Sequence, residues 1–212
     1  MKWKFVCILS IVSVIFGCTK SQIKDSLRAN FRANRYTAVT VFPVNPEDDE
    51  FAECVQKRLK EKLHYLKFIS GENFRKALFP WFEPNTAPDD IRKISVLLSN
   101  TLVRKRIETL GVELLIYVHG RSKTYDENFG GFPYVGALYT AKRETHIWTT
   151  LWDLKKIDRV GDTDISYKGT VVAGIIAVFP VVSPVFSKTN ACSETARRIS
   201  NCLTGKVSST GK

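Results

Sequence analysis

The side chains that could carry chemistry are few, and their spacing does not build a familiar catalytic or metal site. The three histidines are His64, His119 and His146, and none belongs to an HExxH motif or lies near another metal ligand in the sequence. The chain contains no CxxC, no GxSxG, no phosphate-binding loop and no GxGxxG. Adjacent strands could bring His119 and His146 together, but a lone histidine on a strand is usually structural. We therefore expect no metal, no cofactor and no enzymatic activity.

One pair of acids needs a separate argument. Asp153 could stand opposite Asp162 or Asp164 across a hairpin turn, as the two carboxyl groups of a glycosidase do. Acidic side chains in turns are far more often simply solvated, so we expect no catalytic pair. Alanine at Trp152 or Asp153 tests this, because loss of a hydrolytic activity without unfolding would contradict the expectation.

The cysteines outside the first eighteen residues offer one candidate disulfide bond, which an exported protein could form. Cys192 and Cys202 lie ten residues apart on one predicted helix, a rise of ~15 Å that no disulfide can bridge. Cys54 and Cys192 both fall on the buried faces of their predicted helices. We expect the pair Cys54–Cys192, and three buried free thiols are the alternative. A thiol count on denatured, unreduced protein separates the two.

The first residues have the features of a secretory signal. Lys2 and Lys4 form a short basic region, and residues 5–16 are apolar apart from Ser10 and Ser13. This run is too short for a membrane-spanning helix, which needs ~20 apolar residues. A small residue, Gly17, ends the run and a cysteine, Cys18, follows it.

Ile15, Phe16, Gly17 and Cys18 together resemble the lipobox of bacterial lipoproteins. The resemblance implies cleavage between Gly17 and Cys18, a diacylglycerol on the Cys18 thiol and an acyl chain such as palmitate on its new amine. Two or three chains would hold the protein on a membrane, since each buried CH2 contributes roughly 0.8 kcal/mol. Thr19 stands where Asp would favour the inner membrane, so we expect the outer membrane, facing the periplasm. An ordinary signal peptide cut elsewhere, or an uncleaved anchor, is the alternative.

The net charge is +11 over 212 residues, from 32 Lys and Arg against 21 Asp and Glu. Removal of Lys2 and Lys4 with the signal leaves +9. An apolar fraction of 44% with 11% aromatic residues excludes a disordered chain. The basic residues are scattered and follow no nucleic-acid motif, so we expect no nucleic acid. Anionic lipid, lipopolysaccharide or a cell-wall polymer suits the charge of an exported protein better.

Residues 18–36 carry the lipid and five basic side chains against one acid. We expect a flexible tether between the anchor and the domain. The alternative is a basic helix lying on anionic head groups.

The remaining pattern predicts one domain. Apolar, β-branched runs predict strands and a period of three to four residues predicts helices. We expect the proline-rich residues 79–89 to form a loop. Gly111 is expected to end the second helix. Residues 155–162 are expected to form a turn, with Gly161 at its tightest position. We expect strands at 37–44, 67–70, 112–118, 145–154 and 164–171, and helices at 51–63, 89–107 and 192–203.

These elements follow the order β-α-β-α-β-β-β-α. We expect an α/β (α+β) domain over residues 37–203, with a mixed sheet of about five strands and three helices. The signal peptide 1–17, the tether 18–36 and a flexible tail 204–212 lie outside this domain.

Two segments are unusual. Residues 129–139 are rich in glycine and aromatic side chains, which predicts a flexible loop whose aromatic side chains form either a partner surface or part of the core. Residues 169–187 carry no charge, and Pro180 and Pro184 argue against a strand there, so we expect a buried loop. Two alternatives remain, which are a hairpin lent to a membrane barrel and an apolar patch that docks on a membrane or partner. The patch would consist of Phe179, Val181, Val182, Val185 and Phe186.

The element order resembles a group of envelope proteins that includes the curli secretion channel subunit CsgG, the penicillin-binding-protein activator LpoB and the N-terminal domain of TolB. Residues 39–43, Leu110-Gly111-Val112 with the strand 114–118, and residues 150–154 carry the resemblance. It implies a non-enzymatic module that binds an envelope protein partner and assists assembly or secretion. The alternative function is a subunit of an oligomeric outer-membrane secretion channel, and the resemblance allows a homo-oligomer.

Overall fold

The computed structural model of the chain describes part of the sequence and divides it into two compact units. Of the described residues, unit 1 holds those within Met1–Gln22, Ser122–Thr145 and Ser166–Asn190, and unit 2 holds the rest. The predicted signal peptide, residues 1–17, and the predicted lipidation residue, Cys18, lie outside the described part. The described residues are 20–27, 33–34, 37–83, 86, 88, 91–132, 136–176, 179–183 and 187–206.

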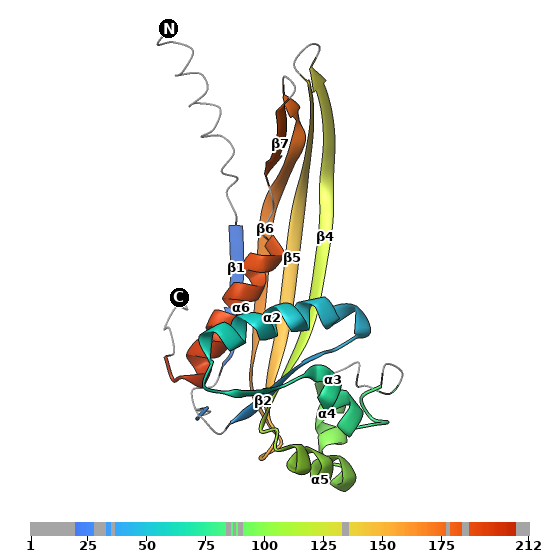
Figure 1. Cartoon of the computed structure of the whole chain (residues 1–212), viewed down its shortest axis with the longest axis vertical. Coiled ribbons are helices and arrows are strands. Elements are labelled where there is room, and N and C mark those ends of the chain that lie inside the picture. Colours follow the sequence, from blue (N-terminus) through green and yellow to red (C-terminus); the bar gives the residue numbers. More distant parts are fainter. Residues whose placement is uncertain are drawn as a thin grey trace. The chain divides into compact units, whose positions relative to one another are not determined.

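The described strands form one mixed sheet of seven strands (Figure 1). Its order is β1-β6-β5-β4-β2-β3, and β7 pairs with β6 outside this path. β2 is parallel to both β3 and β4, whereas β7 is antiparallel to β6. The strands are β1 Lys20–Asp25, β2 Ala38–Pro43, β3 Lys67–Ile69, β4 Leu114–Phe132, β5 Gly136–Asp153, β6 Asp158–Ile176 and β7 Phe179–Ser183. The predicted mixed α/β class is confirmed, with more strands than expected.

Local capping explains where the helices begin and end. α2, Asp49–Lys62, has two acids in its first turn and lysines in its last, which suits the helix dipole. The Ser70 hydroxyl accepts a hydrogen bond from the Asn73 amide at the start of α3, Gly71–Ala77. The last helix, α6, covers Ser187–Leu203, five residues more than the sequence predicts at its start.

The predicted long helix that ends at Gly111 is in fact two helices, α4 Ile91–Leu98 and α5 Thr101–Leu110. Asn100 interrupts it because its side-chain oxygen accepts hydrogen bonds from the amides of Leu102 and Val103 and so begins a new helix. Gly111 ends α5 as predicted, with the positive φ of 67° that glycine tolerates best.

Three loop predictions are wrong. Part of the expected tether is strand β1, which lies beside β6. Most of the expected loop at 129–139 belongs to β4 and β5, and the expected buried loop at 169–187 is largely β6 and β7. Pro180 is tolerated because β7 lies at the side of β6 away from the rest of the sheet, where a missing amide breaks no central ladder. Gly161 lies within β6, and residues 154–157 make the turn.

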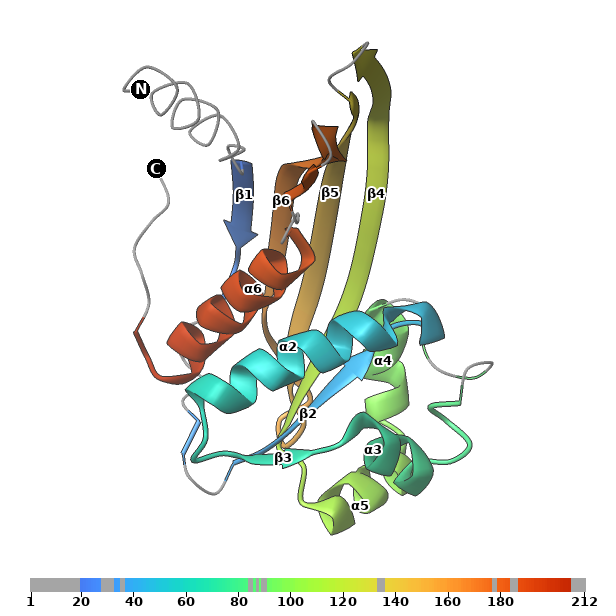
Figure 2. The ribbon, with the colours of Figure 1, turned by 45° about the horizontal axis from the view of Figure 1, so that its top comes forward.

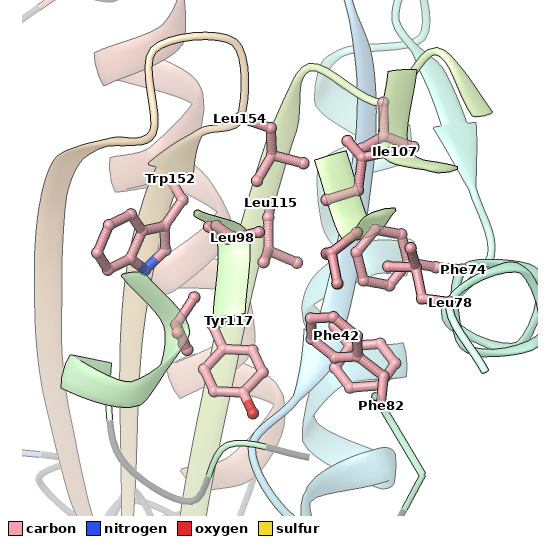
Figure 3. Packing of buried hydrophobic residues seen from close by; sticks show 13 residues of the cluster. Phe42, Phe74, Leu78, Phe82, Leu98, Ile107, Leu115, Tyr117, Trp152 and Leu154 are labelled. Carbon is pink, nitrogen blue, oxygen red and sulfur yellow. The ribbon is translucent and has the colours of Figure 1, made fainter. Parts of the chain in front are cut away.

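The core of unit 2 has a layer of helices on each face of its strands. On one face, α3, α4 and α5 cover Phe42, Leu115, Tyr117 and Trp152 (Figure 3). Phe42 lies between three other rings, with centroids 5.4 to 6.1 Å away. Alternate residues of the same strands are buried on the other face, where α2 and α6 lie side by side (Figure 2).

Candidate functional site

His119, Trp148 and His146 form a row of stacked rings in unit 2. The Trp148 ring centroid lies 5.2 Å from that of His119 and 5.1 Å from that of His146, with interplanar angles of 23° and 17°. Adjacent strands β4 and β5 therefore bring both histidines to the same indole ring. Each imidazole packs against the indole ring of Trp148.

A buried carboxylate fixes one end of this row. Asp48 is 2% exposed and its Oδ2 lies 2.9 Å from Nδ1 of His119. The amides of Asn45 and Gly120 also donate to Asp48, at 3.0 and 2.9 Å. These contacts join the start of α2 to β4 and give Asp48 the partners that a buried carboxylate needs. The arrangement is that of a structural brace.

The acids considered for catalysis are used by local structure. Oδ1 of Asp153 accepts the amides of Lys155 and Lys156 and so closes the turn between β5 and β6. Asp162 accepts hydrogen bonds from Thr150, Ser26 and Arg159. Trp152 belongs to the hydrophobic core, so alanine at Trp152 would disturb folding first.

Among the described residues, no group of three or more His, Cys, Asp or Glu side chains is placed to hold a metal ion. His64 lies apart from the other two histidines, after α2, with its ring 6.2 Å from that of Tyr65.

The structure joins Cys54 of α2 to Cys192 of α6 in a disulfide bond, with Cα atoms 6.0 Å apart. This is the pair that the sequence analysis singled out. Cys202 is free and buried, and burial, followed by the nearby negative charge of Asp25, raises the pKa of its thiol to about 11. A thiol with this pKa is almost entirely protonated at neutral pH and is a poor nucleophile.

A cavity of about 220 Å³ opens in unit 2 between α5 and the start of β4. Four apolar side chains line it, and its other walls carry Arg104, Glu108, Glu113 and Lys155. Glu113 and Lys155 are paired with each other at 2.7 Å. The cavity is smaller than most small-molecule sites, which hold ~300 Å³ or more, so it can take one small apolar group. The apolar lining consists of Leu98, Ile107, Val112 and Leu154.

The ends of four strands in unit 1 carry no charged residue. We call these segments the charge-free strand ends: residues 128–132 of β4, 136–141 of β5, 169–176 of β6 and 179–183 of β7. They lie together, because a Cβ at Gly174 of β6 would collide with the Ala137 carbonyl of β5, and Gly174 pairs with Val181 of β7. Gly130 of β4 in turn lies near the Leu138 carbonyl of β5.

Two large apolar side chains in these ends face solvent. Phe129 is 77% exposed and Ile175 is 56% exposed. Ion pairs follow where the charge-free segments stop, with Lys142 2.7 Å from Asp126 and Lys168 3.1 Å from Glu144. In the sequence-based prediction, Phe129 lies in a loop whose aromatic side chains form a partner surface or part of the core, and Ile175 is left out of the predicted apolar patch. The sequence feature that could have indicated them is that residues 128–141, like residues 169–187, contain no charged side chain.

The side chains of several predicted site residues are not described by the structure. Gly17 and Cys18 lie outside the described residues, as do Val185 and Phe186 of the predicted apolar patch. Phe179, Val181 and Val182 belong to β7, of which only the backbone is described. The helices within the described part are all too short or too polar to cross a membrane.

No protein-family model matches this chain, and no curated protein matches it. Solved structures similar to it include the following three. A point variant of the PelC dodecamer from Paraburkholderia phytofirmans is 9% identical, covers 89% of this chain and 99% of its own, and gives a TM-score of 0.38. A Helicobacter pylori homolog of neuraminyllactose-binding hemagglutinin is 10% identical, with coverages of 87% and 91% and a TM-score of 0.35.

The third is the lipoprotein GNA1162 from Neisseria meningitidis, 8% identical, with coverages of 78% and 98% and a TM-score of 0.31. At scores this low the likeness carries no conclusion about the function of this chain. The resemblance to CsgG, LpoB and TolB stays a prediction.

Proposed function

We propose that this chain is a lipid-anchored protein of the bacterial envelope that binds a protein partner on the periplasmic side of the outer membrane. The observation that carries the proposal is the Cys54–Cys192 bond in a chain that begins with a signal-like segment and Gly17-Cys18. Disulfide bonds persist outside the reducing cytosol, so the bond and the N-terminal pattern point to the same compartment. Acylated Cys18 would then be the membrane anchor.

A role without catalysis is supported because the acidic and histidine side chains considered for catalysis make structural contacts. Asp48, Asp153 and Asp162 each accept hydrogen bonds that brace a turn or a helix start. The imidazoles of His119 and His146 pack on Trp148, which holds them in place as structural rings.

The helices α4 and α5 of unit 2 offer apolar side chains to a protein partner. Val96 of α4 is 74% exposed and Leu102 of α5 is 62% exposed, although each helix has a buried stripe of its own. Exposed aliphatic side chains next to basic ones, such as Arg104 and Lys105, suit a partner with an apolar and acidic surface. Anionic lipid or a cell-wall polymer would be a further ligand for the net positive charge.

The anchor is tested by growing cells with labelled palmitate. The wild-type chain should incorporate label and sediment with outer membranes. Cys18→Ala should incorporate none and remain uncleaved or soluble. Label in Cys18→Ala, or an unlabelled wild-type chain, would contradict the anchor.

The partner surface is tested by crosslinking the lipidated chain in living cells. Val96→Asp with Leu102→Asp should abolish a crosslinked complex that Lys57→Asp with Lys60→Asp leaves intact, because the second pair changes charge on the exposed side of α2. All variants should retain wild-type unfolding midpoints. Equal crosslinking of the two double variants would place the partner elsewhere.

A second candidate is a subunit of an oligomeric outer-membrane secretion channel. The charge-free strand ends favour it, because a channel subunit must offer uncharged strands to the membrane. The register of β2 on β4 stops at Val118, so β2 does not continue along the charge-free end of β4. Particle size in mild detergent separates the candidates: a large, stable ring favours the channel, and a monomer counts against it.

A further inference from the structure

The cavity between α5 and β4 has a floor of core side chains. Its apolar lining belongs to the hydrophobic core of unit 2, and each of the four residues is at most 6% exposed. Figure 3 shows three of them, Leu98, Ile107 and Leu154, among the other side chains of the core. A floor built from packed core residues keeps its shape without a ligand, so little has to be ordered when a ligand binds.

The cavity is open to solvent where α5 ends. Gly111 has a positive φ of 67° and leads the chain from α5 into β4. Gly111 is exposed, and a Cβ there would meet no other atom within 4 Å. The Leu154 amide donates to the Glu113 carbonyl at 2.9 Å and so holds the turn between β5 and β6 at the cavity. A side chain of another molecule can therefore enter beside Gly111.

Charged side chains of both signs surround the apolar floor. Arg104 and Glu108 lie four residues apart on the side of α5 that faces the cavity, and both are exposed. Within the described part of the chain, neither side chain makes an ion pair or a hydrogen bond. Glu113 and Lys155, by contrast, pair with each other at 2.7 Å. A ligand in the cavity therefore meets one cation and one anion that are able to bind it.

The size of the cavity favours a single side chain over a complete small molecule. Its volume is about 220 Å³, and small-molecule sites usually hold ~300 Å³ or more. An engineered apolar cavity of ~150 Å³ in another protein binds benzene, so a phenyl ring fits here.

We propose that the cavity binds a phenylalanine side chain of the protein partner, with an acidic neighbour of that phenylalanine on Arg104 and a basic neighbour on Glu108. The proposal rests on the proposed function, since it assumes a protein partner, and it specifies one contact of that partner. Charge complementarity favours a peptide segment over a lipid. A hydrocarbon chain would contact the floor but would make no ion pair with Arg104 or Glu108.

The test follows the methyl groups of the full chain by NMR in lipid nanodiscs. The probe is the peptide acetyl-Asp-Phe-Lys-amide, and acetyl-Asp-Ala-Lys-amide is the matched control. The phenylalanine peptide should shift the methyl signals of Ile107, Val112 and Leu154 and should bind at least tenfold more tightly than the alanine peptide. The methyl signals of Val39 and Val55, which are buried in β2 and α2 away from the cavity, should not move.

Variants separate the contribution of the ring from that of the charges. Ile107→Phe extends a larger side chain into the cavity and should weaken binding at least tenfold, with the unfolding midpoint in urea as the check on folding. Arg104→Gln and Glu108→Gln change exposed side chains, so the fold tolerates them, and each should weaken binding about threefold. Lys57→Gln, exposed on α2, is the matched control and should bind like wild type.

Two outcomes overturn the proposal. Equal affinities of the two peptides, with no shift of the lining methyl groups, would show that the cavity does not accept the ring. Wild-type affinity in both Arg104→Gln and Glu108→Gln would show that these charges do not recognise a peptide. Crosslinking in cells keeps the proposed function separate. A crosslinked complex without peptide binding refutes only this contact, and peptide binding without any crosslinked complex refutes the proposed partner.

Discussion

Arg198 is the residue whose loss should destabilise the fold most clearly. It donates to both Glu194, at 3.0 Å, and Asp25, and the Arg198 side chain is only 10% exposed. Arg198→Met removes the charge and leaves two partly buried carboxylates, which should lower the free energy of unfolding by about 3 kcal/mol. Urea unfolding followed by circular dichroism measures it.

Arg197→Met is the matched control. Arg197 also pairs with Glu194, but its side chain is 43% exposed, so water replaces the contact and the loss should stay below about 1 kcal/mol. Equal losses for the two variants would show that burial of Arg198 contributes nothing.

Glu194 should make stability depend on pH. Burial raises its pKa, but hydrogen bonds from Arg197 and Arg198 outweigh this and hold the pKa below that of the unfolded chain. Its contribution is therefore present above the unfolded pKa of ~4.3 and is lost as pH falls through the folded value. Glu194→Gln should flatten the decline of the unfolding free energy between pH 5 and pH 3, relative to wild type. An unchanged decline would exclude Glu194 as a source.

The thiols give a residue-scale test of the disulfide. Denatured, unreduced mature protein should show one free thiol, Cys202, and three would contradict the Cys54–Cys192 bond. In the native protein Cys202 should alkylate at least a hundredfold more slowly at pH 8 than a model thiol, because it is buried and its pKa is raised. Rate measurements with iodoacetamide in buffer and in urea test this.

At the scale of elements, Gly161 controls the docking of β1. Its φ is 154°, and a Cβ there would lie 2.6 Å from the Ser26 carbonyl oxygen and 2.7 Å from the Leu27 Cα. Gly161→Ala should push β1 away from β6 and raise amide hydrogen exchange over residues 20–26 at least tenfold.

Gly131→Ala serves as the control, because a Cβ at Gly131 meets no other atom within 4 Å. Exchange in residues 20–26 should match wild type in that variant. If Gly161→Ala also leaves exchange unchanged, the close approach of β1 at Gly161 is not needed for docking.

Elements with strong local patterns were predictable from the sequence. β2 is β-branched and buried along its whole length, and α2 buries Phe51, Val55 and Leu59 at helical spacing. β1 was missed because its sequence, KSQIKD, has no apolar alternation, and its stability comes from contacts with Asp162 and Arg198 far along the chain. The break between α4 and α5 depends on one side-chain cap at Asn100, which the apolar period of the segment conceals.

The sites were less predictable than the elements. The pairing of Cys54 with Cys192 could be inferred from two buried helix faces, whereas the packing of His119 and His146 on Trp148 depends on strand register. The sequence shows that residues 169–187 carry no charge, but Pro180 and Pro184 led to the prediction of a loop there. The charge-free ends of β4, β5, β6 and β7 are seen to lie side by side only when the strands are paired in the sheet.

For the whole molecule, strand β1 belongs to the folded protein. The sequence-based prediction starts the domain at Thr37. A chain that begins there loses β1, and Arg198 loses its ion pair with Asp25. It should unfold about 3 kcal/mol more easily than a chain that begins at Thr19. It should also self-associate with rising concentration, because removal of β1 exposes the hydrogen-bonding edge of β6. Light scattering and urea unfolding of both chains test this, and equal behaviour would restore the tether interpretation.

The disulfide also constrains the order of events if the chain is exported as proposed. Cys54 and Cys192 lie 138 positions apart in the sequence, so the bond would close only after nearly the entire chain had crossed the membrane. Cys202 lies only ten residues after Cys192. Pairing with Cys192 and not with Cys202 would then depend on α6 lying beside α2 when the bond forms.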